Sequence, residues 1–145
     1  MHQTVSTNFS QYHAFTATVD FQHLGLAFEV TGAGHAKPAA KSRTYQNVLL
    51  TVCGWPPIDF GKQALEDLAS HKSLRALCVL RRWPEPEIEL FELIDNKVGY
   101  VQAIVRLDAG EEFWEITGDA VPWILDAKAN AISKLYEQVV RDLQK

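Results

Sequence analysis

The sequence predicts an α+β fold with an antiparallel-dominated sheet of about seven strands, one short central helix, and one long C-terminal helix packed on a face of the sheet. Two observations lead to this prediction. Apolar and polar residues alternate in several segments joined by short turn sequences, as in antiparallel sheets with one side facing solvent. In residues 119–143 the apolar residues instead recur every three or four positions, which is the spacing of an amphipathic helix.

The N-terminal region is expected to contain a loose arm followed by a hairpin. Residues 1–12 are polar and without periodicity, so a single α+β domain is predicted over residues 13–145. Residues 14–21 alternate between apolar and polar side chains, which predicts a half-buried strand. A second strand is expected at residues 24–31, and the short turn between the two strands makes them a hairpin.

Residues 32–44 predict a long basic loop after the hairpin. The segment is rich in glycine, alanine and proline, lacks hydrophobic periodicity, and exceeds the usual length of a connection. We expect it to be mobile, and its cations Lys37, Lys41 and Arg43 are candidates for contact with a partner. It is not a phosphate-binding loop, because that motif requires a second glycine directly before its lysine.

Three further elements are expected between residues 48 and 80. Residues 48–53 form a continuous apolar run of strand length, which predicts a strand buried on both faces. Asp59 is suited to cap the N-terminus of a short helix, whose apolar face continues to Ala69. The apolar run at residues 74–80 predicts a second buried strand.

A three-stranded meander and a long helix complete the predicted fold. The strands are expected at residues 88–93, 98–107 and 112–117, and turns rich in Asp, Asn and Gly separate them. The alternation breaks at residues 90–92, which predicts a bulge. The helix is expected to begin at Asp119, which can act as its N-cap. Its apolar stripe consists of Leu125, Ala129, Ile132, Tyr136, Val139 and Leu143.

Composition and charge exclude several classes of protein. With 47% hydrophobic and 22% charged residues, the chain has the composition of a soluble globular protein. It has no secretory signal pattern and no apolar stretch of about 18 residues, so a cytoplasmic location without a membrane span is expected. A pI near 5.7 argues against nucleic acid as the partner. Cys53 and Cys78 lie in apolar runs and are expected to be buried free thiols, with a disulfide between them as the alternative.

Negative charge is concentrated in the predicted meander. Residues 85–119 contain ten carboxylates and two cations, whereas the whole chain has a net charge of −4. If the strands pair as their turns imply, several carboxylates share one face, where like charges repel each other. Such a face attracts a basic partner and speeds encounter, although a merely solvated face is the simpler interpretation. The candidate partner-binding residues are Glu87, Glu89, Glu92, Glu111, Glu112, Glu115 and Trp83.

The sequence favours a non-catalytic protein-binding module, of the adaptor, inhibitor, immunity or chaperone type, that docks a basic protein. It contains no motif for a catalytic nucleophile, a metal site or a cofactor site, and its five histidines are scattered. One alternative is acid–base chemistry by Glu111 and Glu112 beside Asp108. Another is an apolar ligand, or less favoured an active site, in a pocket between the C-terminal helix and the sheet. The oligomeric state does not follow from the sequence.

Overall fold

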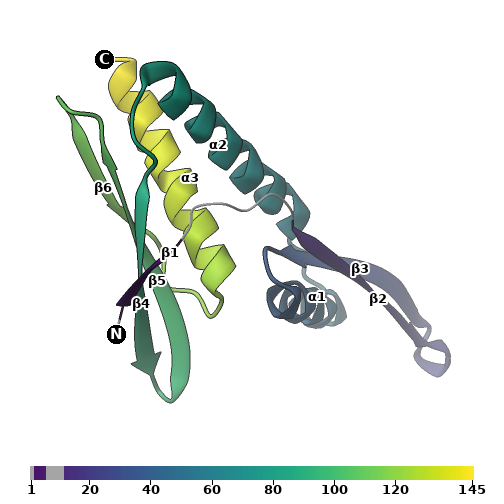
Figure 1. Cartoon of the computed structure of the whole chain (residues 1–145). Coiled ribbons are helices and arrows are strands. Elements are labelled where there is room, and N and C mark those ends of the chain that lie inside the picture. The colour runs from purple at the N-terminus through teal and green to yellow at the C-terminus, as the bar shows by residue number, and fades with distance from the viewer. Residues whose placement is uncertain (1, 6–11) are drawn as a thin grey trace. The chain divides into compact units, whose positions relative to one another are not determined.

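Helices and strands follow one another in an order that differs from the predicted one in the middle of the chain. The computed structural model describes the backbone of residues 2–5 and 12–145 and the side chains of residues 12–145. Its elements are β1 (His2–Val5), β2 (His13–Phe21), the 3-10 helix η1 (Gln22–Leu24), β3 (Leu26–Gly34), α1 (Lys37–Val52), α2 (Phe60–Arg81), β4 (Glu87–Asp95), β5 (Val98–Asp108), β6 (Phe113–Thr117) and α3 (Ile124–Leu143) (Figure 1).

The strands form two small antiparallel sheets, so the predicted single sheet of about seven strands is wrong. β2 pairs with β3, whereas the other sheet has the strand order β1-β4-β5-β6. The chain is nevertheless α+β, as expected. The strand count was too high because two apolar segments that were assigned to central strands are helical.

The described residues group into two compact units, and each unit contains one of the sheets. The first consists of residues 12–65, and the second of residues 2–5 and 66–145. The single domain over residues 13–145 stays a prediction. Within the predicted arm, β1 pairs with β4, with His2 opposite Phe91. Residues 1 and 6–11 lie outside the described residues, so the loose arm also stays a prediction.

The β2–β3 hairpin confirms the prediction for this part of the chain. Its register runs without interruption from the pair His13–Gly34 to the pair Phe21–Leu26. The residues of η1 and Gly25, which has a φ of 63°, turn the chain between the strands. This left-handed conformation favours glycine, which explains the residue at this position.

Helix α1 replaces the predicted mobile loop, so that prediction is wrong. Residues 32–34 belong to β3, and the helix begins at Lys37 with Pro38 in its first turn, where a proline is tolerated. The buried residues of α1 are Ala39, Ala40, Thr44 and Asn47. They recur at helical spacing, but they are small or polar, so a search for large apolar residues does not detect them.

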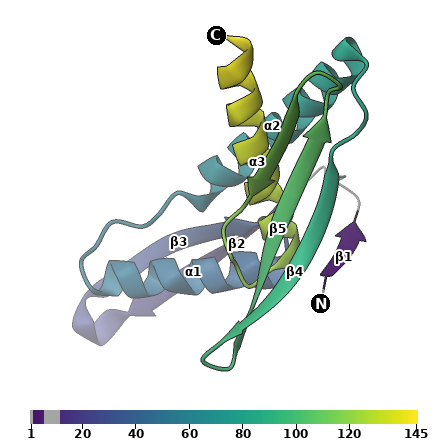
Figure 2. The same cartoon turned by 90° about the vertical axis from the view of Figure 1, so that its left-hand side faces the viewer.

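The close contact between α1 and the hairpin depends on glycine in β3. A Cβ atom at Gly32 would lie 2.2 Å from the backbone nitrogen of Thr44, and one at Gly34 would lie 2.8 Å from Cβ of Ala39. α1 therefore lies directly on the hairpin, as Figure 2 shows. The hydroxyl of Thr44 donates hydrogen bonds to the carbonyls of Ala40, at 2.7 Å, and Phe15, at 3.2 Å.

The segment predicted as a central strand, residues 48–53, is instead the C-terminal end of α1 and its C-cap residue, Cys53. Leu49 and Val52 are exposed there, and Cys53 is an exposed free thiol rather than a buried one. Fully buried Asn47 ties this end of the helix to its surroundings. Its side-chain amide donates to the carbonyls of Thr31, at 2.7 Å, and Ile58, at 2.9 Å, and accepts from the N–H of Ile58.

Helix α2 continues through both of the elements that were predicted for residues 60–80. The Asp59 carboxylate accepts a hydrogen bond from the backbone N–H of Lys62 at 3.0 Å, so the predicted cap is confirmed. The helix does not stop at Ala69, and the predicted strand at 74–80 is wrong. A short apolar run fits either element. Leu74 and Cys78 are buried, whereas Ala76, which a strand would place on the same face as both, is exposed, as expected for a helix. Cys78 is a free thiol, and burial raises its pKa.

The meander is confirmed as β4, β5 and β6. The ladder between β4 and β5 is continuous from the pair Glu87–Arg106 to the pair Asp95–Val98, so the predicted bulge at residues 90–92 is wrong. Phe91 breaks the polar–apolar alternation without breaking the register, because it lies half-buried on the outward face, opposite Gln102.

Helix α3 covers the inward face of this sheet (Figure 1). It begins at Ile124 rather than at Asp119, because Val121 still pairs with Val101 of β5. The Asp119 carboxylate instead accepts hydrogen bonds from Lys134, at 2.7 Å, and Asn130. The fully buried core between helix and sheet includes Ile88, Val105, Leu107, Ile132, Leu135 and Val139. Among the described residues, no helix is long and apolar enough to cross a membrane.

A hydrogen bond at the C-terminal end of α3 makes the stability depend on pH. The indole N–H of Trp114 donates to the Asp142 carboxylate at 2.8 Å. This bond, helped by hydrogen bonds from Gln138 and Lys145, lowers the pKa of Asp142 against an opposing effect of desolvation. A folded-state pKa below the unfolded one gives stability that is present above the unfolded value, about 3.9, and is lost as the pH falls through the folded value.

We therefore expect Asp142→Asn to lower the thermal unfolding midpoint at pH 7, and the difference from the wild type to shrink below about pH 4. The isosteric amide keeps an acceptor for Trp114 but loses the charge and the second oxygen, which accepts from Gln138 and faces Lys145. Circular dichroism melts of both proteins between pH 7 and pH 2.5 provide the measurement. A difference that stays constant over this range would contradict the assigned cause.

Candidate functional site

Three of the predicted partner-binding carboxylates lie together on the outward face of the sheet. Glu87 and Glu89 of β4 and Glu115 of β6 alternate with buried Ile88 and Trp114, so they point away from α3. The register places Glu87 and Glu115 directly opposite the same residue of β5, one from each side. Period-two alternation and the short turns were sufficient to predict this grouping.

The residue between these carboxylates is Arg106, whose position sequence reasoning missed. Its guanidinium donates to Glu115 at 2.7 Å and also to Glu89. The hydrogen bonds that Arg106 donates to Glu115 and Glu89 raise its pKa above the ordinary value, so it is always charged. Arg106 balances one of the three carboxylates and fixes the orientation of two of them. Only the strand register, which the sequence did not specify, places it in this position.

Glu111 and Glu112 extend this charge into the turn between β5 and β6, and both are exposed. In the same turn the Asp108 carboxylate accepts the N–H of Gly110 at 3.0 Å, which is a turn-forming contact. The neighbouring Phe113 is exposed as well. We call Glu87, Glu89, Glu111, Glu112 and Glu115, with Arg106 among them, the acidic sheet face.

Two of the predicted partner-binding residues lie elsewhere. Glu92 falls on the opposite side of β4, between Leu90 and Ile94, because it is an odd number of residues from Glu87 and Glu89. Trp83 is half-buried after the end of α2, and its ring lies 5.6 Å from that of Trp114. The guanidinium of Arg81 covers the ring of Trp83 at 5.9 Å. Trp83 therefore caps the core of this unit, which leaves the acidic sheet face without it.

The three cations of the predicted loop lie on α1, and two of them contact their own unit. The ammonium group of Lys41 lies 5.5 Å from the ring of Phe15. The Arg43 guanidinium donates to the carbonyl of Ala33 at 3.1 Å and lies 5.4 Å from the ring of Phe60. Lys37 is exposed in the first turn. Arg43 and Lys41 thus hold the helix to the hairpin; a role in partner binding stays a prediction.

An apolar strip adjoins the acidic sheet face on the same side of the sheet, and sequence reasoning did not identify it. Leu93 pairs with Tyr100, and Phe91 lies two residues before Leu93 on β4. Val98, at the start of β5, is on the same side, and both Val98 and Leu93 are exposed. The apolar residues of the strip can be seen in the sequence of each strand, but they adjoin one another only when β4 and β5 pair in register.

The core side chains named above pack between α3 and the sheet, which is the place predicted for an apolar ligand in the alternative hypothesis; that alternative stays a prediction. The unit of residues 12–65, which we call the hairpin unit, has an opening of about 340 Å³ beside the start of α2. Val30, Ile58 and Phe60 contribute apolar surface there, and Glu29 and Asp59 contribute carboxylates. The Asp59 carboxylate already caps the N-terminus of α2, where it accepts the backbone N–H of Lys62. In the part of the chain that the structure describes, no three His, Cys, Asp or Glu side chains are grouped to hold a metal ion.

Comparison with known proteins adds no family to this description. The chain matches no protein-family model and no curated protein sequence.

Proposed function

We propose that this protein is a non-catalytic protein-binding module whose acidic sheet face docks a basic protein partner. The observation that supports the proposal is the arrangement around Arg106, which orients Glu89 and Glu115 on an open sheet face. Each carboxylate can accept several hydrogen bonds, so both retain capacity for a partner's Lys or Arg after binding Arg106. A face prepared in this way loses little side-chain entropy when a cation binds.

The distribution of charge supports a role in recognition. Glu87, Glu111 and Glu112 add negative charge around the oriented pair, and such a concentrated field speeds the approach of a basic partner. Phe113 and the adjoining apolar strip provide apolar contact area at the edge of the charged region. The free thiols of Cys53 and Cys78 agree with action in a reducing compartment, which we propose to be the cytoplasm.

The proposal predicts that neutralising three carboxylates of the acidic sheet face weakens capture of a basic partner. The test variant replaces Glu87, Glu111 and Glu112 by glutamine, which leaves both hydrogen bonds of Arg106 intact. Exposed ion pairs contribute about 0.2–1 kcal/mol each, so we expect roughly a tenfold loss of affinity. Immobilised protein and source lysate, at low and at high salt, provide the measurement, because salt screens exposed charges.

A variant with the same net charge separates location from total charge. It replaces exposed Glu29, Glu66 and Glu137, which lie outside the acidic sheet face, by glutamine. We expect this control to capture the same basic protein as the wild type. Equal capture by the control and the acidic-face variant, or capture that high salt does not weaken, would refute docking at this face.

A further inference from the structure

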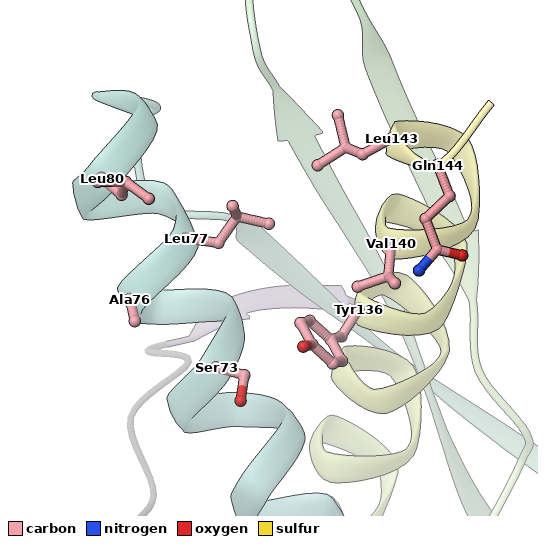
Figure 3. Close-up of a pocket in the computed structure, with 8 residues that line it drawn as sticks. All are labelled: Ser73, Ala76, Leu77, Leu80, Tyr136, Val140, Leu143 and Gln144. Atoms are coloured by element: carbon pink, nitrogen blue, oxygen red, sulfur yellow. The ribbon is translucent and has the colours of Figure 1, made fainter.

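The unit of residues 2–5 and 66–145, which carries the acidic sheet face, has a second surface with an apolar groove and an excess of positive charge. The groove lies between the second half of α2 and the end of α3, with a volume of about 360 Å³. Figure 3 shows its lining: Ala76, Leu77 and Leu80 extend from α2, and Tyr136, Val140 and Leu143 extend from α3. Ser73 of α2 and Gln144 after α3 complete the lining, which is mainly apolar, and the groove is open to solvent.

The apolar surface continues from the groove onto the outside of α2. Leu80 is 78% exposed and Val79 is 80% exposed, although both are large aliphatic side chains. The same helix buries Leu74 and Cys78 on its other side, so it presents two apolar faces. A helix needs only one of them to pack against its own unit. A contiguous exposed apolar surface of this kind marks a site for an interaction partner.

The charges that α2 places beside the groove are positive. Residues 69–84 contain Lys72, Arg75, Arg81 and Arg82 and no carboxylate. Lys72 is exposed one turn before Ala76, on the same side of the helix. On the other wall, exposed Glu137 follows Tyr136 and exposed Arg141 follows Val140, so the two charges of α3 balance and the excess of positive charge comes from α2. Basic residues at the end of α2 also offset the helix dipole, but Lys72 is more than two turns from that end.

This combination selects one class of occupant. The groove is bounded by two helices and open to solvent, and an amphipathic helix can place apolar residues into it at positions i, i+3 or i+4, and i+7. The cations of α2 favour negative charge on that helix. We propose that the groove between α2 and α3 binds an acidic amphipathic helix from another protein. The protein then has two docking surfaces of opposite charge, and the second is independent of the first.

A designed peptide tests this proposal directly. The probe is a fluorescently labelled helical peptide with leucine at positions i, i+4, i+7 and i+11 and glutamate along both edges. A second peptide has lysine in place of every glutamate. We expect saturable binding of the acidic peptide in fluorescence anisotropy, at least tenfold weaker binding of the basic peptide, and weaker binding at high salt. Absence of saturable binding, or equal binding of both peptides, would overturn the proposal.

Variants locate the binding to the groove. We expect Leu80→Ser and Lys72→Glu each to weaken binding of the acidic peptide, together by at least tenfold, and neither to change the circular dichroism spectrum, since both residues are exposed. Ile94→Ser is the matched control, because Ile94 is an exposed aliphatic residue on β4, outside the groove. An equal effect of Ile94→Ser would overturn the assignment to this groove.

Two further measurements address other occupants. If sedimentation shows that the wild type forms a dimer and Leu80→Ser a monomer, a second copy of the chain occupies the groove, and the proposal is wrong. Binding to vesicles of anionic phospholipid that Leu80→Ser abolishes, without binding of the acidic peptide, would assign the surface to a membrane instead. The variant with the neutralised acidic sheet face should bind the acidic peptide normally, so failure of either surface leaves the other testable.

Discussion

We expect Gly32→Ala to lower the free energy of unfolding of the hairpin unit by about 3 kcal/mol or more, at or above the upper end of the range for overpacking. The added Cβ would lie 2.2 Å from the backbone nitrogen of Thr44 and 2.6 Å from the carbonyl carbon of Arg43. Both atoms belong to the backbone of α1, so no side-chain rotation relieves the collision. The helix must move away from β3, which lengthens the hydrogen bond from Thr44 to Phe15.

Gly99→Ala is the matched control for this prediction. Gly99 is also a strand glycine, but a Cβ added there meets no atom within 4 Å. Since alanine restricts the unfolded chain more than glycine does, we expect this variant to be neutral or slightly stabilised. Urea denaturation followed by circular dichroism compares the two variants, and hydrogen exchange at the amides of α1 identifies the part that opens. Similar unfolding midpoints and similar exchange in both variants would contradict the proposed close contact.

The second large effect is expected from Leu74→Ala, which should cost about 2–5 kcal/mol, the range measured for deletion of a buried leucine side chain. Leu74 is 1% exposed and belongs to the core between α2, α3 and the sheet. Leu80→Ala, on the same helix, should change stability by no more than about 0.5 kcal/mol, because the side chain is already in solvent.

This pair of variants also tests the helix against the predicted strand. Leu74 and Leu80 are six residues apart, so they would share one face of a strand and would lose similar stability on truncation. In α2 they point in different directions, and their losses should differ by at least about 1.5 kcal/mol, given the ranges above. The urea midpoints of the two variants provide the measurement. Equal losses would contradict the helical assignment of residues 74–80.

The parts of the fold that could be predicted from sequence are those in which large apolar residues have one clear period. The alternation of residues 14–21 gave β2, and the turns at 95–97 and 108–110 gave the boundaries of β4, β5 and β6. The stripe from Leu125 to Leu143 gave α3, although not its first residue. In each case one face is buried and the other is in solvent, so the pattern directly records the environment.

The parts that were missed have a different pattern. α1 buries Ala39, Ala40, Thr44 and Asn47, whose small size matters only because Gly32 and Gly34 lie opposite. α2 exposes Val79 and Leu80 as well as burying Leu74, so its apolar residues do not form a single stripe. We attribute that second apolar face to a binding partner. Apolar residues on such a second face add to those that face the core, so the apolar residues no longer recur at the helical spacing that predicts a helix.

The candidate site shows the same division. Composition located the negative charge, and alternation placed Glu87, Glu89 and Glu115 on the outward face. The position of Arg106 between Glu89 and Glu115 depends on the pairing of three strands, and the pairing of Trp83 with Trp114 depends on how α2 approaches the sheet. These are contacts between residues distant in sequence, which no local pattern encodes.

The sequence by itself determined the α+β class, the hairpin, the acidic meander and the C-terminal helix, because each follows from local periodicity and turn chemistry. Only the tertiary structure decided that residues 37–52 and 60–81 are helices, that the strands divide into two sheets, and that an apolar groove lies beside α3. The physical reason is that these features depend on what each side chain packs against, such as the backbone of α1 against Gly32, and not on the side chain alone.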